Sequence, residues 1–266
     1  MTVTFDLKKA AFDNWITVFT YVKDLTYKEN GTIGTVIPKI PFPLFNLVLQ
    51  SEIKEFEIES EIESVKKKYK EFNLNFNWSI TPFTKPNNFE KYLIDKGFQY
   101  KNAIPHMGIL NSDIDESIFN EVNQSKLKIK KIDKENFEEY FSTLESGFEM
   151  GSIDRKVWYD GFNEFFGAFL DDPRGNEIGF YLGYFENKPV CTSLGIISND
   201  VLGIYNISTI PGFRKRGFGR IMTLDLVRQG YEKANGSILQ ASAVGKPVYE
   251  KLGFSTLYEA KAYSLT

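Results

Sequence analysis

The sequence predicts an α/β (α+β) protein of two domains, each a mixed, mostly antiparallel sheet flanked by helices. The chain has 266 residues, of which 42% are hydrophobic, enough for two ordinary cores. Short apolar runs typical of strands lie between longer segments in which apolar residues recur every three or four positions, as in helices. The polar stretch 111–125 reads as a linker, so we expect domains at residues 1–125 and 126–266.

In the first half, the recurrence of Phe12, Trp15 and Phe19 predicts a helix within residues 5–28. A second helix is expected over 52–72, where early glutamates and late lysines complement the helix dipole. Gly97 is expected to close a short helix that begins at Phe89. The expected strands cover residues 44–49 and 76–80, a segment opened by Phe98, and residues 107–110.

In the second half, Asp133 is placed to cap a helix containing Phe137 and Phe148, after a strand over 127–132. Aromatic residues at helical spacing predict another helix over 158–169. Short turns between the next three apolar runs indicate an antiparallel meander, with strands at 179–185, 190–197 and 202–210. Thereafter we expect a helix from Ile221 to near Gly236, a strand at 238–241, a short helix at 247–252, and final strands from Phe254.

Composition excludes several classes of function. A net charge of −3 gives no basis for binding nucleic acid or an anionic membrane. The one cysteine, Cys191, and the one histidine, His106, leave neither an internal disulfide nor a cysteine- or histidine-based metal site. Cys191 is expected to be buried, and His106 is expected to lie either in a loop or in the core. No leader pattern or 18-residue apolar run occurs, so we expect a cytoplasmic protein without a metal.

Two short stretches resemble each other across the halves. Asn88–Phe98 and Gly245–Phe254 both read as a short helix closed by Gly-Phe. A divergent duplication and a chance likeness of two capped helices both account for this pattern.

The chemistry centres on residues 214–219, Arg-Lys-Arg-Gly-Phe-Gly, between a predicted strand and a predicted helix. Glycines let a ligand approach the backbone, and a helix N-terminus offers free N–H groups and a positive dipole. This combination predicts an anion site for a pyrophosphate. Met222 stands where a Rossmann fingerprint needs glycine or alanine, and the Gly-Lys-Ser/Thr of a P-loop is absent.

The ordered set of a strand ending at Thr209, Arg214-x-x-Gly217-x-Gly219, a helix, a further strand and the segment Tyr249–Phe254 resembles the GNAT (GCN5-related) family of acyl-CoA-dependent N-acyltransferases. The likeness covers about residues 126–266 and implies acetyl-CoA as the co-substrate. It implies that the strand end binds the pantetheine arm, that the glycine loop binds the pyrophosphate, and that Ser242 takes the place of an asparagine common in the family. The residues carried over are Ile207, Ser208 and Thr209 for the arm, and Arg214, Lys215, Arg216, Gly217, Phe218, Gly219 and Arg220 for the pyrophosphate.

The same resemblance implies that Tyr249 is the general acid. Amine attack on a thioester ends with a thiolate leaving group, whose conjugate acid has a pKa of roughly 8.5, and a phenol with a pKa of about 10 is a suitable proton donor. The alternative is a packed aromatic residue. Backbone N–H groups near Thr209 are candidates to stabilise the oxyanion.

No residue is fixed as general base. Glu164, Tyr159 and a chain of water molecules are all candidates. The aromatic side of the 158–169 helix is expected to be core, with a wall of the acceptor pocket as the alternative. The first half resembles a degenerate GNAT-like domain without the glycine loop, so we expect it not to bind acyl-CoA.

The sequence therefore predicts an N-acetyltransferase that moves an acetyl group from acetyl-CoA directly to a primary amine. The alternatives are a non-catalytic CoA-binding or regulatory protein, a longer acyl-CoA, and a peptide acceptor instead of a small-molecule amine. The chain is expected to be a monomer or a homodimer.

Overall fold

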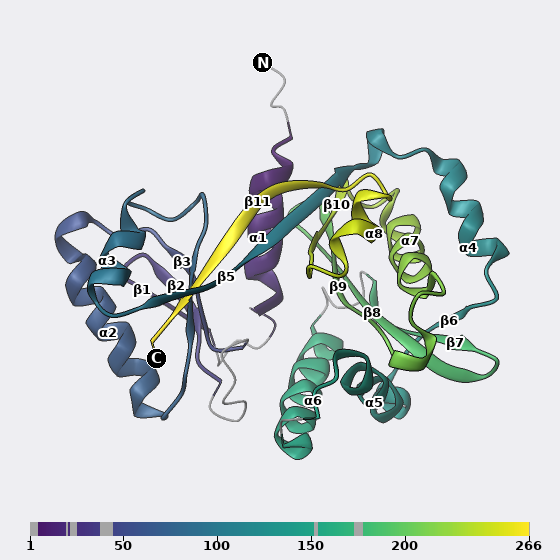
Figure 1. Ribbon diagram of the computed structural model, residues 1–266, viewed down its shortest axis with the longest axis horizontal. Helices are drawn as coiled ribbons and strands as arrows, with labels where there is room; N and C mark the ends of the chain where they lie inside the picture. The colour runs from purple at the N-terminus through teal and green to yellow at the C-terminus, as the bar shows by residue number, and fades with distance from the viewer. Residues whose placement is uncertain are drawn as a thin grey trace. The chain divides into compact units, whose positions relative to one another are not determined.

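The computed structural model describes residues 5–19, 21, 26–37, 45–151, 154–172 and 178–265. The chain divides into two compact units. The large unit comprises residues 1–21 and 106–257, and the small unit comprises residues 22–105 and 258–266. Each unit has its own set of strands and helices (Figure 1). Two long strands, β5 (Gln99–Leu110) and β11 (Ser255–Ser264), pass from one unit into the other.

The sheet of the large unit has the strand order β5-β10-β9-β8-β7-β6. All neighbouring strands are antiparallel except β9 and β10, which run parallel and are joined by the crossover helix α7. The three-stranded meander predicted from the sequence is confirmed by β7, β8 and β9. The strands are β6 (Lys128–Lys131), β7 (Gly179–Phe185), β8 (Lys188–Ser198), β9 (Val201–Thr209) and β10 (Gly236–Gln240).

Helices cover both faces of this sheet (Figure 1). One face packs on α7: methyl groups placed on Gly183 and Gly195 would press on side chains of that helix at 2.9 and 3.0 Å. The other face packs on α1 and α5. The helices of the unit are α1 (Leu7–Phe19), α4 (Asn120–Gln124), α5 (Phe137–Phe148), α6 (Arg155–Asp171), α7 (Phe218–Gly230) and α8 (Lys246–Glu250).

Helix α1 is tied to the β8–β9 hairpin by a buried asparagine. Asn14 donates through Nδ2 to the carbonyl oxygens of Ile196, Ser198 and Val201 at 3.2–3.3 Å. Its Oδ1 accepts from the Tyr205 hydroxyl at 2.5 Å. Because a buried amide left unpaired costs about 1–3 kcal/mol, this network fixes where α1 docks.

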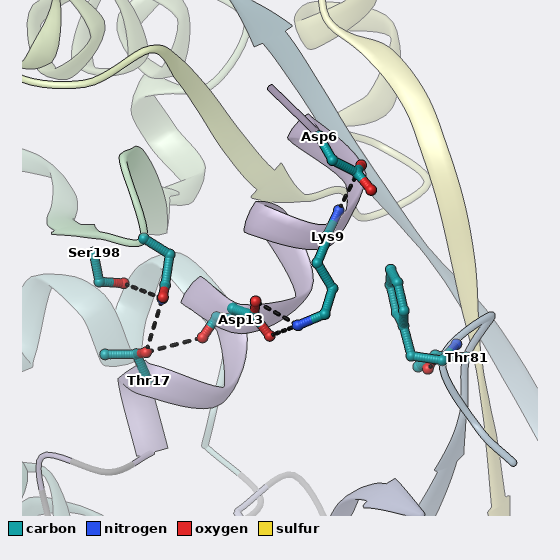
Figure 2. A network of polar contacts seen from close by, with 8 residues as sticks. Asp6, Lys9, Asp13, Thr17, Thr81 and Ser198 are labelled. Carbon is teal, nitrogen blue, oxygen red and sulfur yellow. Dashed lines mark hydrogen bonds and ion pairs between the residues drawn. The ribbon is translucent and has the colours of Figure 1, made fainter. Parts of the chain in front are cut away.

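A second set of polar contacts runs along α1 to the turn between β8 and β9 (Figure 2). Lys9 pairs with Asp13 one helical turn away. The Thr17 hydroxyl donates to the Asp13 carbonyl at 2.9 Å, and Asn199 Nδ2 donates to Thr17 Oγ1 at 3.2 Å. The N-terminal helix therefore belongs structurally with the second half of the sequence.

The aromatic side of α6 is core. Trp158, Phe162, Phe166 and Phe169 are buried. Phe166 stacks on Phe137 of α5 at 4.6 Å between ring centroids and meets Phe180 of β7 edge-on at 4.9 Å. The expectation of a packed core, rather than a pocket wall, is confirmed for these rings.

The sheet of the small unit has the strand order β1-β2-β3-β4-β11. Strands β3 and β4 run parallel, joined by α2, and the other neighbours are antiparallel. Tyr69 of α2 stacks on Phe76 at 4.0 Å and donates to the carbonyl oxygens of Thr35 and Leu47 at 2.7 and 3.0 Å. The elements are β1 (Thr26–Glu29), β2 (Thr32–Thr35), β3 (Leu47–Ser51), α2 (Ile58–Glu71), β4 (Asn77–Ile80) and α3 (Phe89–Asp95).

Three sequence-based expectations differ from the structure. The predicted linker 111–125 consists of two 3₁₀ turns and α4, because Asp115 caps the second turn and apolar side chains such as Phe119 pack on the core. The strands expected from Phe98 and at 107–110 are the single strand β5. The helix expected to end near Gly236 ends at Gly230, and Gly236 begins β10. Residues 20, 22–25 and 44 of the expected helix and strand lie outside the described residues.

The two units also do not meet at the boundary expected between residues 125 and 126, because each unit is built from two separate stretches of the chain. Helix α1 packs with β8 and β9, and the end of β11 pairs with β4. Both arrangements depend on contacts between segments more than 170 residues apart, which local sequence patterns do not report. Within the part of the chain that the structure describes, no helix is long and apolar enough to cross a membrane.

Candidate functional site

The two parallel strands of the large unit pair over only part of their length. Pairing between β9 and β10 ends at Ile204↔Leu239, while β9 continues to Thr209 along β8. Residues 205–209 thus have a strand neighbour on one side only, among the residues that the structure describes. An extended ligand can add to such an edge through main-chain hydrogen bonds.

The open segment contains a β-bulge. Ser193 of β8 lies opposite two residues of β9, Asn206 and Ile207, because the register shifts between Thr192↔Ser208 and Leu194↔Tyr205. Asn206 has a φ of +53°, in the left-handed region that asparagine tolerates better than most residues. The strand end predicted to hold a pantetheine arm therefore has a fixed irregularity.

The glycine loop lies directly after this strand end. Gly217 is the N-cap of α7, with a φ of +81°, and Lys215 also has a positive φ, +62°. The first turn of the helix leaves the amide N–H groups of residues 217–220 without intrahelical partners. A methyl group placed on Gly217 would meet no heavy atom within 4 Å, so the loop backbone is open to a ligand. The open loop backbone and the first turn of α7 lie where the anion site is expected, and anion binding there stays a prediction.

The basic side chains of the loop differ in what they contact. Arg214 donates to the carbonyl oxygens of Thr209 and Gly147 at 3.1 and 2.8 Å and pairs with Glu149 at 3.0 Å. Arg220 makes a two-pronged contact with Glu121, with both N···O distances 2.8 Å. Two of the four loop cations thus have carboxylate partners within the protein.

The other two cations face solvent. The Arg216 guanidinium lies over the ring of Phe213, 4.8 Å from its centroid, a cation–π geometry. Lys215 is exposed, and no carboxylate partner for either Lys215 or Arg216 occurs among the described residues. Phe218, by contrast, is buried and packs on Phe185 at 5.2 Å. Its side chain anchors the helix, leaving only its backbone N–H for a ligand.

Ser242 and Tyr249 come together on either side of the first turn of α8. Ser242 Oγ accepts from the Gly245 N–H at 3.0 Å, so the hydroxyl organises this turn. A methyl group placed on Gly245 would lie 3.0 Å from the Tyr249 ring and 3.2 Å from Ser242 Oγ. Residue 245 therefore has to be small for the two side chains to approach as they do.

Tyr249 is 8% exposed and belongs to the core of the large unit. Burial raises the pKa of its phenol to about 12, because the charged form loses hydration. Its hydroxyl has no hydrogen-bond partner among the described residues. The ring is thus packed as a core residue, and its role as a proton donor stays a prediction.

Tyr159, His106 and Cys191 all pack against other side chains. Tyr159 packs edge-on against Phe141 at 5.2 Å between ring centroids. His106 is buried against Trp15, and burial lowers its pKa to about 3. Burial raises the pKa of the Cys191 thiol to about 12. The expected burial of Cys191 is confirmed, and of the two places expected for His106 the structure has the core. Within the described ranges, no group of three or more His, Cys, Asp or Glu side chains is arranged to hold a metal ion.

The residues that contact the bulge and the arginines of the glycine loop were not predicted from the sequence. Thr192 contacts the bulge, Gly147 and Glu149 receive Arg214, and Glu121 receives Arg220. One signal was available for the bulge: asparagine is depleted in strands, and Asn206 interrupts the apolar run of β9. The arginine partners come from 65 to 99 residues away and left no local signal.

No family model and no curated protein matches the sequence. Solved structures do match the fold. A GCN5-related N-acetyltransferase from Kribbella flavida has a TM-score of 0.71 at 14% identity, over 97% of this chain and 96% of that one. One from Sphaerobacter thermophilus has 0.61 at 11%, over 88% and 76%. A GNAT-family acetyltransferase from Colwellia psychrerythraea has 0.57 at 9%, over 99% of both chains. The chain therefore has the fold of the GCN5-related N-acetyltransferases.

Proposed function

We propose that this protein is a cytoplasmic N-acetyltransferase that moves an acetyl group from acetyl-CoA to a primary amine, either a small molecule or a peptide N-terminus. The observation that carries the proposal is the open edge of β9, residues 205–209, leading directly into the glycine-rich N-terminus of α7. An extended arm followed by a pyrophosphate matches this sequence of sites. The acetyltransferases that share the fold support the reaction class.

The proposed reaction is direct transfer. The amine nitrogen attacks the thioester carbonyl to form a tetrahedral adduct, whose oxyanion is stabilised by backbone N–H groups of the β9 end. The adduct collapses as the C–S bond breaks. Tyr249 donates its proton to the departing sulfur, and the attacking nitrogen loses a proton to water or to a side chain such as Glu164.

The raised pKa of Tyr249 has a consequence for this role. A phenol with a pKa of about 12 remains protonated at neutral pH and is a weaker acid than free tyrosine. This observation favours the alternative of a CoA-binding protein without transfer, in which Tyr249 only packs. The two functions share the binding site and differ in turnover.

We further propose that the chain is a tandem of two GNAT-like halves and that only the large unit binds acyl-CoA. Both units have a meander, a helix crossover and a parallel strand pair. The small unit has glutamates, instead of a glycine loop, before its crossover helix.

Release of coenzyme A over a panel of amines tests the transferase proposal. We expect turnover in the wild type and a loss of about 10²–10⁴-fold in kcat for Tyr249→Phe, the range for a general acid, with acetyl-CoA affinity retained. Tyr181→Phe is a matched control, because burial also raises the pKa of Tyr181 to about 12 and its hydroxyl donates to Gln229 at 2.7 Å. Equal turnover of Tyr249→Phe and wild type would remove the acid role. Binding of acetyl-CoA without turnover on any amine would favour the CoA-binding protein.

A further inference from the structure

The bulge in β9 changes which way the end of the strand faces. Before the bulge, Leu202 packs on Gly230 of α7, while Gly203 and Tyr205 face Asn14 of α1 on the opposite side. Strand residues alternate between faces, so in a regular strand Ile207 would also face α1. The extra residue reverses this alternation.

After the bulge, Ile207 and Thr209 face the glycine loop. A methyl group placed on Gly219 would lie 3.7 Å from Ile207 Cγ2 and 3.9 Å from Thr209 Oγ1. Ser208 faces the other side, where a methyl group placed on Gly147 of α5 would lie 2.3 Å from its Oγ. The relation between the open strand edge and the N-terminus of α7 therefore depends on the bulged register.

One buried hydroxyl contacts both sides of the bulge. Thr192 Oγ1, on β8, donates to the Asn206 carbonyl at 2.7 Å and lies 2.8 Å from Ser208 Oγ. Thr192 is fully buried. In an unbulged register, continued from Leu194↔Tyr205, Thr192 would stand opposite Ile207 and not opposite Ser208. The hydroxyl therefore makes this pair of contacts specifically in the bulged register.

The bulge needs such support. Asn206 has a left-handed backbone, which is less favourable for a residue with a side chain, and its bulged position lacks regular ladder pairing. Tyr140 of α5 is buried in the same place, with Asn206 and Thr192 as neighbours. A hydroxyl that accepts and donates within this buried group favours one register because its loss would leave a buried carbonyl unpaired.

We propose that Thr192 is a positioning residue for acyl-CoA, holding the bulge in β9 so that the backbone of residues 206–209 and the glycine loop form one continuous site. This inference rests on the proposed function. Thr192 faces α5 and acts only through β9.

The test compares Thr192→Val, which has nearly the same shape without the hydroxyl, with Thr192→Ser, which restores a hydroxyl. Thr143→Val is the matched control, because Thr143 is also buried and donates its hydroxyl to a backbone carbonyl, that of Glu139, at 2.8 Å. We expect Thr192→Val to weaken acetyl-CoA binding about 10-fold and to reduce kcat further, Thr192→Ser to recover most of both, and Thr143→Val to change neither.

Amide hydrogen exchange provides a readout that does not depend on acyl-CoA. We expect faster exchange at residues 205–209 in Thr192→Val than in Thr143→Val, in unliganded protein. Equal exchange and equal affinity in the two valine variants would overturn the inference. Faster exchange in Thr192→Val, together with a wild type that binds no acyl-CoA, would instead retain the role in holding the bulge and contradict the proposed function.

Discussion

The two units contain the same arrangement of elements with different chemistry at its centre. In the small unit β1, β2 and β3 form a meander, and α2 crosses to β4, which is parallel to β3. In the large unit β7, β8 and β9 form a meander, and α7 crosses to β10, which is parallel to β9. A short helix and a long strand follow in both, α3 with β5 and α8 with β11. The two units differ in the pairing of one strand end and in the loop before the crossover helix.

The first difference concerns the strand that continues beyond its pairing with a parallel neighbour, which is β3 in the small unit and β9 in the large unit. In the small unit, Lys85 N–H donates to the Ser51 carbonyl at 2.8 Å, and Ile53 N–H donates to the Lys85 carbonyl at 3.1 Å. The continuation of β3 is thereby paired with a neighbouring segment. In the large unit, the corresponding end of β9 has no such partner among the described residues. Only the large unit offers main-chain groups to a ligand there.

The second difference is the loop before the crossover helix. Three glutamates, Glu55, Glu57 and Glu59, lie at the start of α2, where carboxylates complement the helix dipole and repel an anion. Two glycines and three arginines lie around the start of α7. The order and pairing of these elements are common to both units, while the proposed function depends on the chemistry of the loop.

The largest effect is expected at Gly217. Asparagine tolerates a positive φ but adds a side chain that would extend into the open space where the ligand backbone is proposed to lie. We expect Gly217→Asn to weaken acetyl-CoA binding by about 100-fold or more, since loop N–H groups and the helix N-terminus are blocked together. Calorimetric titration measures this.

Gly97 supplies the control for that variant. It has a φ of +88°, and a methyl group placed there would come no closer than 4.0 Å to another residue. It lies in the small unit, directly after the C-terminal cap of α3. Gly97→Asn should bind acetyl-CoA like the wild type; a similar loss in both variants would show that the effect is general instability.

A smaller effect, on stability, is expected from the only histidine. Because burial lowers the pKa of His106 to about 3, against about 6.5 when unfolded, the unfolded chain takes up a proton first as the pH falls. The contribution of the neutral His106 to the free energy of unfolding is present above pH 6.5 and is lost as the pH falls below that value. Between pH 7 and pH 5 the loss is about 2 kcal/mol.

Urea unfolding at the two pH values measures it. His106→Gln should lose about 2 kcal/mol less than the wild type over this interval, because the titrating group is gone. An identical pH dependence in both proteins would contradict the buried, neutral state of His106. The small unit contains no histidine, so this sensitivity belongs to the large unit.

The smallest effect is expected from Glu149. Its carboxylate pairs with Arg214 at 3.0 Å and is well exposed, so the pair contributes less than about 1 kcal/mol to stability. Glu149→Gln removes a negative charge beside the proposed phosphate site. We expect acetyl-CoA to bind about two- to fivefold more tightly at low salt and the gain to shrink at high salt. Unchanged affinity at low salt would place the phosphates away from Arg214.

The sequence predicted those features that depend on neighbouring residues. Helical spacing indicated α1, α2, α5, α6 and α7. Asp133, expected to cap the helix that contains Phe137, caps the 3₁₀ turn Lys134–Asn136 that leads into α5: its carboxylate accepts from the Glu135 N–H at 2.9 Å and from the Asn136 N–H at 3.3 Å. The glycine loop was recognisable because its chemistry lies in six consecutive residues.

Features that depend on distant pairing were not predictable in the same way. The docking of α1 depends on Asn14 reaching carbonyl groups more than 180 residues away. The bulge depends on Thr192 standing opposite Ser208, and the state of Arg214 depends on Gly147 and Glu149. Each of these contacts is formed only when the sheet has assembled, so local periodicity contains no record of it.

We propose that one unit, and not both, forms an acyl-CoA site. Calorimetric titration of the wild-type chain with acetyl-CoA tests it most directly, with Gly217→Asn titrated in parallel. We expect one molecule bound per chain, and no remaining site in the variant at the same concentrations. Two molecules per chain, or one molecule still bound to Gly217→Asn with unchanged affinity, would contradict it.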